Sequence, residues 1–116
     1  SSGNINYNDC DKVDGFYIKR GGWYSQLFKD DGFKEAVKAR WNNVKGDVLG
    51  EILSIGNITN QLGSSSTNNF LRWDILGTYV WPNRIVTGSY DGEVSAFIAW
   101  IVQRYHWLDG AIQELI

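Results

Sequence analysis

Histidine, cysteine and clustered carboxylates are the side chains that most often do chemistry, and this chain of 116 residues holds few of them. His106 is its one histidine and Cys10 its one cysteine. A zinc site needs three or four Cys, His or acidic ligands. A Cys–His nucleophile pair needs further groups that orient it, and the sequence places no such group beside either residue. The sequence therefore predicts neither a zinc site nor a cysteine nucleophile.

The acidic segment Asn8–Gly15, which reads NDCDKVDG, is the nearest approach to a calcium loop. An EF-hand loop carries ligands at positions 1, 3 and 5 and glycine at position 6. Counting from Asp9 places Asp11 at position 3, but it places Val13 at position 5 and Asp14 where glycine is required. A solvated loop is therefore favoured over a divalent-ion site.

Aromatic residues are the other candidates for binding, and the chain has six Trp. Large rings bury much apolar area, so several of these Trp are expected to anchor the core. Aromatic rings in loops can also stack on the apolar faces of sugars. A glycan platform of this kind would require Trp23 or Trp81 to be exposed to solvent, so their exposure separates the two interpretations. The aromatic residues in or beside irregular segments are Trp23, Tyr24, Tyr79, Trp81 and Tyr90.

Composition indicates an ordinary globular domain, or part of one, because 43% of the residues are hydrophobic and 21% are charged. The net charge is −2 and no basic cluster occurs, so nucleic acid is not expected as a partner. The longest apolar run, 97–102, is far shorter than the roughly 20 residues that span a bilayer. The composition therefore leaves catalytic, binding and structural roles open.

These residues would be positioned by a mainly α fold of about five helices with an irregular N-terminal arm. Residues 1–21 are rich in Asn, Asp and Gly and form the arm, in which 16–18 is a short apolar island, either a strand or a packed loop. Residues 22–116 form the helical part. A short helix is predicted at 23–28, and Asp30 or Asp31 caps the next helix, which we expect to end at Gly46.

Three further helices complete the prediction. One begins at Asp47 and runs to about residue 62, with Gly50 and Gly56 allowing close helix approach. A loop over 63–66 precedes a helix from about residue 67 to Gly77. The last helix starts at Ser89 or the next residue, and its apolar residues recur at alternating four- and three-residue steps. These residues are Val94, Ile98, Ile101, Tyr105, Leu108, Ile112 and Leu115.

The order of the aromatic motifs resembles the C-terminal part of the CotH kinase-like family, named for a spore-coat protein. Residues 22–41 read GWYSQLFKDDGFKEAVKARW and residues 89–108 read SYDGEVSAFIAWIVQRYHWL, with NFLRW at 69–73 and WPN at 81–83 between them. The family shows an LF-D--F segment leading into a V--RW helix, then a W-----W-N stretch and a closing EV--L--W---R--WLD helix. The positions that match are structural: Trp23, Phe28, Phe33, Arg40, Trp41, Trp73, Trp81, Asn83, Trp100, Arg104, Trp107 and Asp109.

The resemblance implies an atypical protein-kinase fold whose catalytic and metal-binding residues lie upstream of residue 1, with Gly3 as the last residue of the acidic motif. It implies ATP and Mg²⁺ as cofactors of the parent domain, none of them held by this segment. It also implies a secreted or cell-surface location. Phosphoryl transfer needs the acidic metal ligands and the nucleotide-clamping lysine, so no catalytic residue is carried over, and this segment alone is not expected to be an enzyme.

Two functions from different classes follow. The first is a helical buttress of a CotH-like kinase domain, whose parent transfers phosphate from ATP to protein hydroxyls and whose partner is the upstream part of that domain. The alternative is a helical surface module that interacts with carbohydrate and does no catalysis. A buttress separated from its domain should expose apolar surface and self-associate. We further expect Arg40 to lie over Trp41 and Arg104 over Trp107, with Arg104 also paired to Asp109 or Glu93, so that these arginines fix the second helix to the last.

Overall fold

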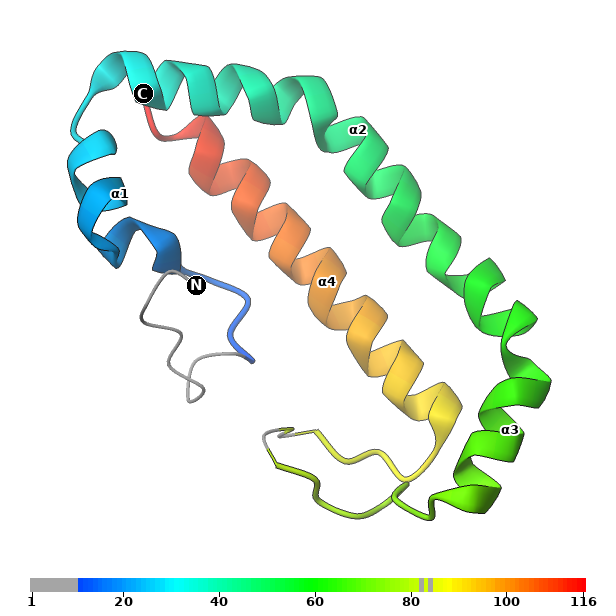
Figure 1. The fold of residues 1–116 in the computed structure, drawn as a ribbon. Coiled ribbons are helices and arrows are strands. Elements are labelled where there is room, and N and C mark those ends of the chain that lie inside the picture. Colours follow the sequence, from blue (N-terminus) through cyan, green and yellow to red (C-terminus); the bar gives the residue numbers. More distant parts are fainter. Residues whose placement is uncertain (1–10, 82, 84) are drawn as a thin grey trace.

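The computed structural model describes residues 11–81, 83 and 85–116. Its elements are a 3-10 helix η2 (Tyr17–Arg20) and the helices α1 (Gly22–Leu27), α2 (Asp31–Gln61), α3 (Gly63–Arg72) and α4 (Tyr90–Gln113). Within those residues no strand occurs, so the prediction of a mainly α fold with an irregular N-terminal region is confirmed (Figure 1). The apolar island at 16–18 contributes to η2, not to a strand.

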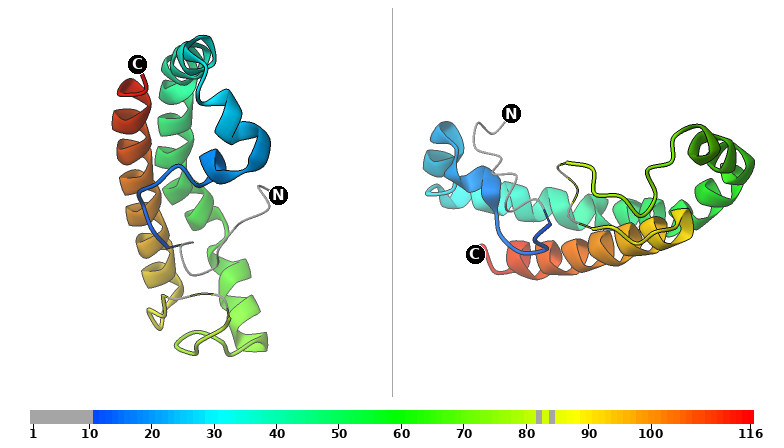
Figure 2. Two further views of the ribbon diagram at one scale, coloured as in Figure 1. Left: turned by 90° about the vertical axis from the view of Figure 1, so that its left-hand side faces the viewer. Right: turned by 90° about the horizontal axis from the view of Figure 1, so that it is seen from below.

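Two long helices, α2 and α4, form the body of the molecule. They run antiparallel and side by side, and they share the most extensive contact between elements (Figures 1 and 2). The short helices α1 and α3 lie at opposite ends of this pair, and the C-terminus lies beside the start of α2. The fold therefore brings residues near 40 next to residues near 110.

Side-chain caps set the start of both long helices. Oδ1 of Asp30 accepts a 2.8 Å hydrogen bond from the backbone N–H of Phe33, and Oγ of Ser89 accepts one of 3.0 Å from Gly92. Each cap satisfies a backbone donor that the first turn of a helix leaves unpaired. Glu93 adds a 2.8 Å hydrogen bond from the N–H of Thr87, which holds the incoming chain against α4. Both predicted helix starts are confirmed.

The expected break at Gly46 is wrong, because α2 continues without interruption from Asp31 to Gln61. Glycine in a helix interior costs only about 1 kcal/mol relative to alanine. Trp41 and Lys45, before Gly46, make contacts with α4, and Ile52, after it, is buried. Tertiary packing of this kind routinely overrides the local preference.

Two further expectations about glycine and serine are wrong. A Cβ added at Gly50 or Gly56 would have no atom within 4 Å, so these glycines do not allow a close helix approach. The serine run 64–66 lies inside α3, which begins at Gly63 and ends at Arg72 instead of Gly77. The hydroxyls of Ser66 and Thr67 donate back to the carbonyl of Gly63 at 2.8 and 3.1 Å. Gly77 instead stands in the following turn with φ of +79°.

The core is small. Among the described residues, the buried hydrophobic side chains are Ile52 of α2 and Tyr105 and Ile112 of α4. The radius of gyration is 17.6 Å, whereas a compact chain of this length has about 13 Å. The accessible surface is 8275 Å², whereas about 6400 Å² is typical of a folded monomer of this mass. The two long helices therefore bury one face each and leave much apolar surface uncovered.

Candidate functional site

Four of the twelve family-matching residues meet along the α2–α4 pair and where the N-terminal arm crosses it. At the first of these places Trp41 of α2 packs against Tyr105 of α4, with ring centroids 5.6 Å apart. Its indole Nε1 donates to Oδ1 of Asp109 at 2.8 Å, and the ammonium of Lys45 lies 3.1 Å from the same oxygen. The hydrogen bond from Trp41, those from Gln113 and Lys45, and the charge of Lys45 lower the pKa of Asp109. A single carboxylate thus joins the two helices.

The last turn of α4 extends this contact. Nε2 of Gln113 donates to Oδ1 of Asn42 at 2.5 Å and to Oδ1 of Asp109 at 3.3 Å. Nζ of Lys38 donates to the backbone carbonyl of Gln113 at 3.1 Å and so satisfies an acceptor that the helix end leaves open. Polar side chains of α2 therefore cap the C-terminal end of α4, which is where a cation is also favoured by the helix dipole.

Arg104 does not join α2 to α4, and this expectation is wrong. Its Nη1 donates to the backbone carbonyls of Val13 at 2.9 Å and Gly15 at 2.8 Å. Asp109 is instead bound by α2, and Glu93 is bound by Thr87, so neither pairs with Arg104. The guanidinium does lie over the ring of Trp107, 5.2 Å from its centroid, as expected. Arginine carries several donors in a rigid fork, which suits it to hold two carbonyls at once.

Trp100 adds a third hydrogen bond to the same segment of the arm. Its Nε1 donates to the carbonyl of Asp11 at 2.9 Å. The three accepting carbonyls belong to alternate residues, 11, 13 and 15, and the two donors stand one helical turn apart on α4. We call this contact the arm latch. In these three hydrogen bonds, side chains of α4 hold residues 11–15 through the backbone carbonyls of the arm.

Aromatic rings fill the space between η2, α1 and the start of α2. Phe28 meets Phe33 edge to face with centroids 5.1 Å apart, and Phe16 meets Trp107 in the same way at 5.0 Å. Such pairs add about 0.5–1.5 kcal/mol beyond the area that they bury. Three more of the family-matching residues, Phe28, Phe33 and Trp107, thus stabilise this end of the molecule.

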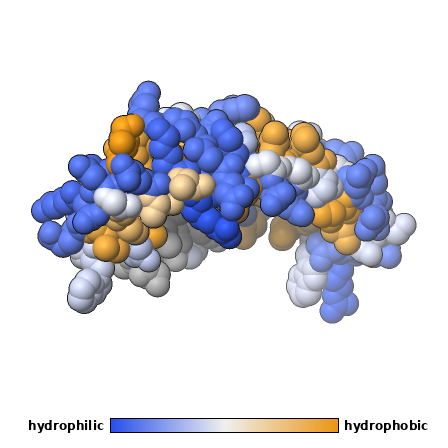
Figure 3. All heavy atoms as spheres, turned by 90° about the horizontal axis from the view of Figure 1, so that it is seen from above, coloured by the Kyte–Doolittle hydropathy of each residue, from blue (hydrophilic) through white to orange (hydrophobic). Residues whose placement is uncertain are grey.

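The remaining family-matching residues lie on the surface. Trp23 is 86% exposed, Trp81 67% and Trp73 57%. Arg40 and Asn83 are exposed as well. No tryptophan of the described residues is fully buried, so the expectation that several of them anchor the core is wrong. Figure 3 shows one face of the molecule, on which separate apolar patches interrupt a hydrophilic surface and the outline is hollowed between the two ends.

The described residues contain no group of three or more His, Cys, Asp or Glu side chains that could hold a metal ion. His106 is exposed on α4, where its ring meets that of Tyr105 at 5.5 Å. Cys10, Asp9 and the segment 3–7 lie outside the described residues, and so does part of the acidic segment 8–15. Over the same described part of the chain, no helix combines the length and the apolar character that crossing a membrane requires.

Sequence reasoning missed several residues that make these contacts. Lys38, Lys45 and Gln113 look like ordinary solvated charges and amides, and their partners lie 64 or more positions away. For Lys45 the sequence did offer an indication. It stands four residues after Trp41, and this spacing places both residues on one face of α2. Tyr105 belongs to the apolar seam that the sequence predicts, and its burial confirms that part of the prediction.

Comparison of the chain with models of protein families, with curated proteins and with solved structures gave no match.

Proposed function

We propose that this chain is a structural helical subdomain whose α2–α4 pair completes its core against a larger domain. In line with the motifs at 22–41 and 89–108, the larger domain is of the CotH kinase-like type and transfers phosphate from ATP to protein hydroxyls with Mg²⁺. This chain supplies no catalytic residue to that reaction. This chain supports the catalytic part of that domain. The whole protein is secreted or lies on the cell surface.

The observation that supports the proposal is that few hydrophobic side chains are buried. A chain of this length folds with a contiguous core, yet three hydrophobic side chains are buried among the described residues. Exposed apolar residues such as Leu53 and Leu71, at 72% and 79%, are costly in water unless another surface covers them. The surface in excess of a compact monomer, about 1900 Å², is more than one partner contributes to a standard protein interface.

The composition of α4 supports the same conclusion. Apolar side chains of α4 extend beyond its contact with α2, from Tyr105, which packs against Trp41, to Phe97, which is 50% exposed. The side that holds Ser95, Gln103 and His106 is polar and exposed. In this structure α2 covers one side and the arm covers another, so a further layer is needed to bury the rest.

The test compares this chain with a chain extended upstream through the acidic motif, by thermal unfolding with and without Mg-ATP. Saturating nucleotide, at about 100 times Kd, stabilises a binding protein by about 2.7 kcal/mol. We expect stabilisation of the extended chain and none of this one. Stabilisation of this chain alone would overturn the assignment of the nucleotide site to the upstream part.

A variant pair tests docking separately from nucleotide binding. Leu71→Ser should change the unfolding temperature of the isolated chain very little, because the side chain is 79% exposed, and it should lower that of the extended chain clearly. Arg40→Ala, at an exposed polar position, is the matched control for both chains. Equal effects of Leu71→Ser in the two chains would show that no further layer covers this residue.

A carbohydrate-interaction module is the second candidate, and the exposure of Trp23 and Trp81 is the observation that favours it. Exposed indoles can stack on sugar rings without rearrangement of the fold. Binding to a glycan array, lost in Trp81→Ala or Trp23→Ala and kept in Arg40→Ala, would support it. If Trp81→Ala, Trp23→Ala and Arg40→Ala all bind the glycan array equally, a glycan site built on these tryptophans is excluded.

A further inference from the structure

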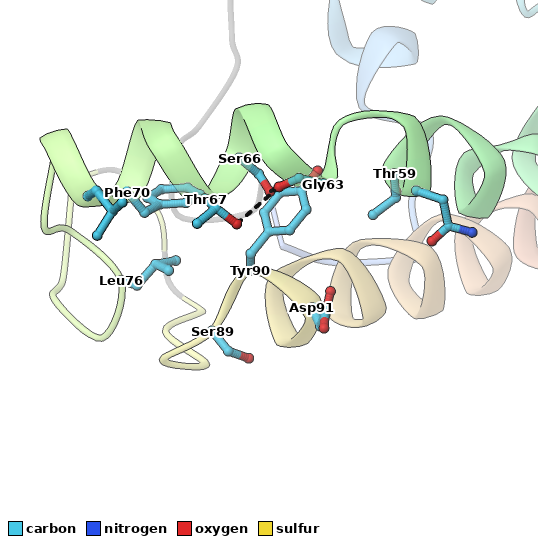
Figure 4. A pocket seen from close by; sticks show the side chains of 11 residues that line it. Thr59, Gly63, Ser66, Thr67, Phe70, Leu76, Ser89, Tyr90 and Asp91 are labelled. Carbon is cyan, nitrogen blue, oxygen red and sulfur yellow. Dashed lines mark hydrogen bonds between the residues drawn. The ribbon is translucent and has the colours of Figure 1, made fainter.

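A cavity of about 620 Å³ lies where the end of α2, the whole of α3 and the first turn of α4 meet. Its size falls in the range of about 300–1000 Å³ that is typical of small-molecule sites. Figure 4 shows side chains from α2, from α3 and from the start of α4 around one hollow. None of the family-matching residues lines it.

Two aromatic rings and a leucine form its apolar side. Phe70 of α3 and Tyr90 of α4 face each other with centroids 6.0 Å apart, and Leu76 lies beside them (Figure 4). Tyr90 is half-buried, and its hydroxyl makes no hydrogen bond with the described residues. A ring held in this way offers a flat apolar face to a ligand at little cost in conformational entropy, together with one free hydroxyl.

The polar side is rich in acceptors. The hydroxyl of Thr59 donates to the carbonyl of Ile55 at 2.8 Å, and that of Thr67 donates to the carbonyl of Gly63 at 3.1 Å. Their protons are therefore used within the helices, and only lone pairs remain for a ligand. The carboxylate of Asp91, at the start of α4, is an acceptor as well when ionised. Asn60 also lines the cavity, and its amide can donate as well as accept. Such a wall fits a ligand whose groups mostly donate hydrogen bonds and also accept them.

The charge of the lining residues limits the class of ligand further. Among the described residues that line the cavity, Asp91 is the one that carries a charge, and none of them is a lysine, an arginine or a histidine. An anionic ligand would meet a carboxylate and no compensating cation, which disfavours nucleotides, phosphates and carboxylic acids. The ligand is therefore neutral or cationic, has an apolar face and carries several hydrogen-bond donors.

We propose that this cavity binds one neutral sugar ring, which stacks on Tyr90 and donates its hydroxyls to Thr59, Thr67 and Asp91. A pyranose has the required apolar face, the required row of hydroxyl donors and no charge. The site does not involve the exposed tryptophans, but it shares Leu71 with the face that the proposed larger domain would cover. Sugar binding is therefore measured on the isolated chain, and its failure would leave both candidate functions standing.

The test is a titration of the whole chain, followed by amide chemical shifts, with methyl glucoside, methyl galactoside and N-acetylglucosamine. At least one of these sugars should bind saturably in the millimolar range and shift the amides of Gly63, Thr67 and Tyr90. Thr67→Val keeps the shape and removes one acceptor, so it should weaken binding about fivefold. Tyr90→Ala removes the stacking ring and should weaken binding about tenfold.

Two variants and two ligands serve as controls. Ser54→Ala removes a hydroxyl that also donates to its own helix but lies outside the cavity, and Trp81→Ala removes an exposed indole, so both should bind the sugar as the parent chain does. Methylammonium chloride and inorganic phosphate should shift none of the cavity amides. The proposal is overturned if no sugar shifts them, if methylammonium shifts them equally, or if Trp81→Ala abolishes the effect.

Discussion

Nε1 of Trp41 donates a 2.8 Å hydrogen bond to Oδ1 of Asp109, a residue 68 positions later in the chain. Lys45 reaches the same oxygen, and Gln113 reaches it from within α4. Three donors thus converge on one carboxylate oxygen at the place where the first half of α2 lies beside the end of α4. This convergence fixes the register of the two long helices, since a shift by one turn would leave Asp109 without its partners on α2.

The first prediction concerns the stability of the fold in acid. The folded chain lowers the pKa of Asp109 below 3.8, chiefly through the hydrogen bond from Trp41. The ionised carboxylate therefore stabilises the fold fully above the unfolded pKa, and this contribution is lost as pH falls through the folded pKa. Asp109→Asn should cost about 1 kcal/mol at pH 7, because charge-assisted hydrogen bonds are worth more than neutral ones but this one is partly exposed.

Thermal unfolding of the parent chain and of Asp109→Asn, measured from pH 7 to strong acid, tests this effect. The difference in unfolding temperature, about 4–8 °C at neutral pH for a small domain, should shrink toward zero in acid. Asp47→Asn, at an exposed position of α2, is the matched control and should show little difference at either pH. A difference for Asp109→Asn that stays constant with pH would contradict the role given to its charge.

The second prediction concerns the arm latch. Arg104→Ala removes two hydrogen bonds to the carbonyls of Val13 and Gly15, so the arm should open more often while the contact of Trp41 with Asp109 persists. Limited trypsin digestion should then cut faster after Lys12, Lys19 or Arg20, as read by mass spectrometry. Gln103→Ala, next to it and exposed, should leave the rate unchanged. Faster cutting across α2 instead would mean that Arg104 stabilises the helix pair.

The third prediction separates a continuous α2 from a helix that ends at Gly46. Because Gly46 is helical and a Cβ there would meet nothing within 4 Å, Gly46→Ala should stabilise the chain by about 0.5–1 kcal/mol. Gly77 has φ of +79°, so Gly77→Ala should destabilise the chain by more, about 1–2 kcal/mol. Chemical denaturation measures both. Destabilisation by Gly46→Ala would restore the helix end that the sequence suggested.

The fourth prediction compares adjacent residues on α2. Ile52 is 5% exposed and packs in the small core, so Ile52→Ala should cost about 2–5 kcal/mol and bring the chain near unfolding. Leu53 is 72% exposed, so Leu53→Ala should stay within about 0.5 kcal/mol. Urea denaturation of the pair gives both values. Similar losses at the two positions would show that α2 buries a different face.

The fifth prediction is self-association. Exposed apolar side chains on α2, α3 and α4 leave more surface than a compact monomer has, so the isolated chain should form dimers or larger species as its concentration rises. Sedimentation equilibrium over a wide concentration range measures this. Leu53→Ser and Phe97→Ser should each weaken the association. A strictly monomeric chain at high concentration would count against the proposal that a further layer covers these faces.

Local chemistry explains which parts of the fold could be predicted. The mainly α class, the caps at Asp30 and Ser89 and the apolar seam through Tyr105 all depend on residues within one or two turns of each other. Interactions at such spacing are the ones that a sequence pattern displays directly. The break at Gly46 was wrong because the pattern there shows a weak helix former but not the helix that packs beside it.

The contacts that form the candidate sites join residues that are far apart in the sequence. The pattern predicted that Arg104 lies over Trp107, three positions away, but not that its donors reach the arm 89 and 91 positions earlier. It gave no sign that the end of α2 would meet the start of α4 and form an open cavity beside Tyr90.

The amino-acid sequence by itself determined where most helices begin and which residues of α4 face a neighbour, because caps and periodicity act within a few residues. Only the tertiary structure decided that α2 runs through its glycines, that Asp109 belongs to Trp41 and Lys45, and that three tryptophans stay in solvent. Those outcomes depend on contacts between segments 64 or more positions apart, where the gain in packing has to exceed the cost of ordering the chain between them.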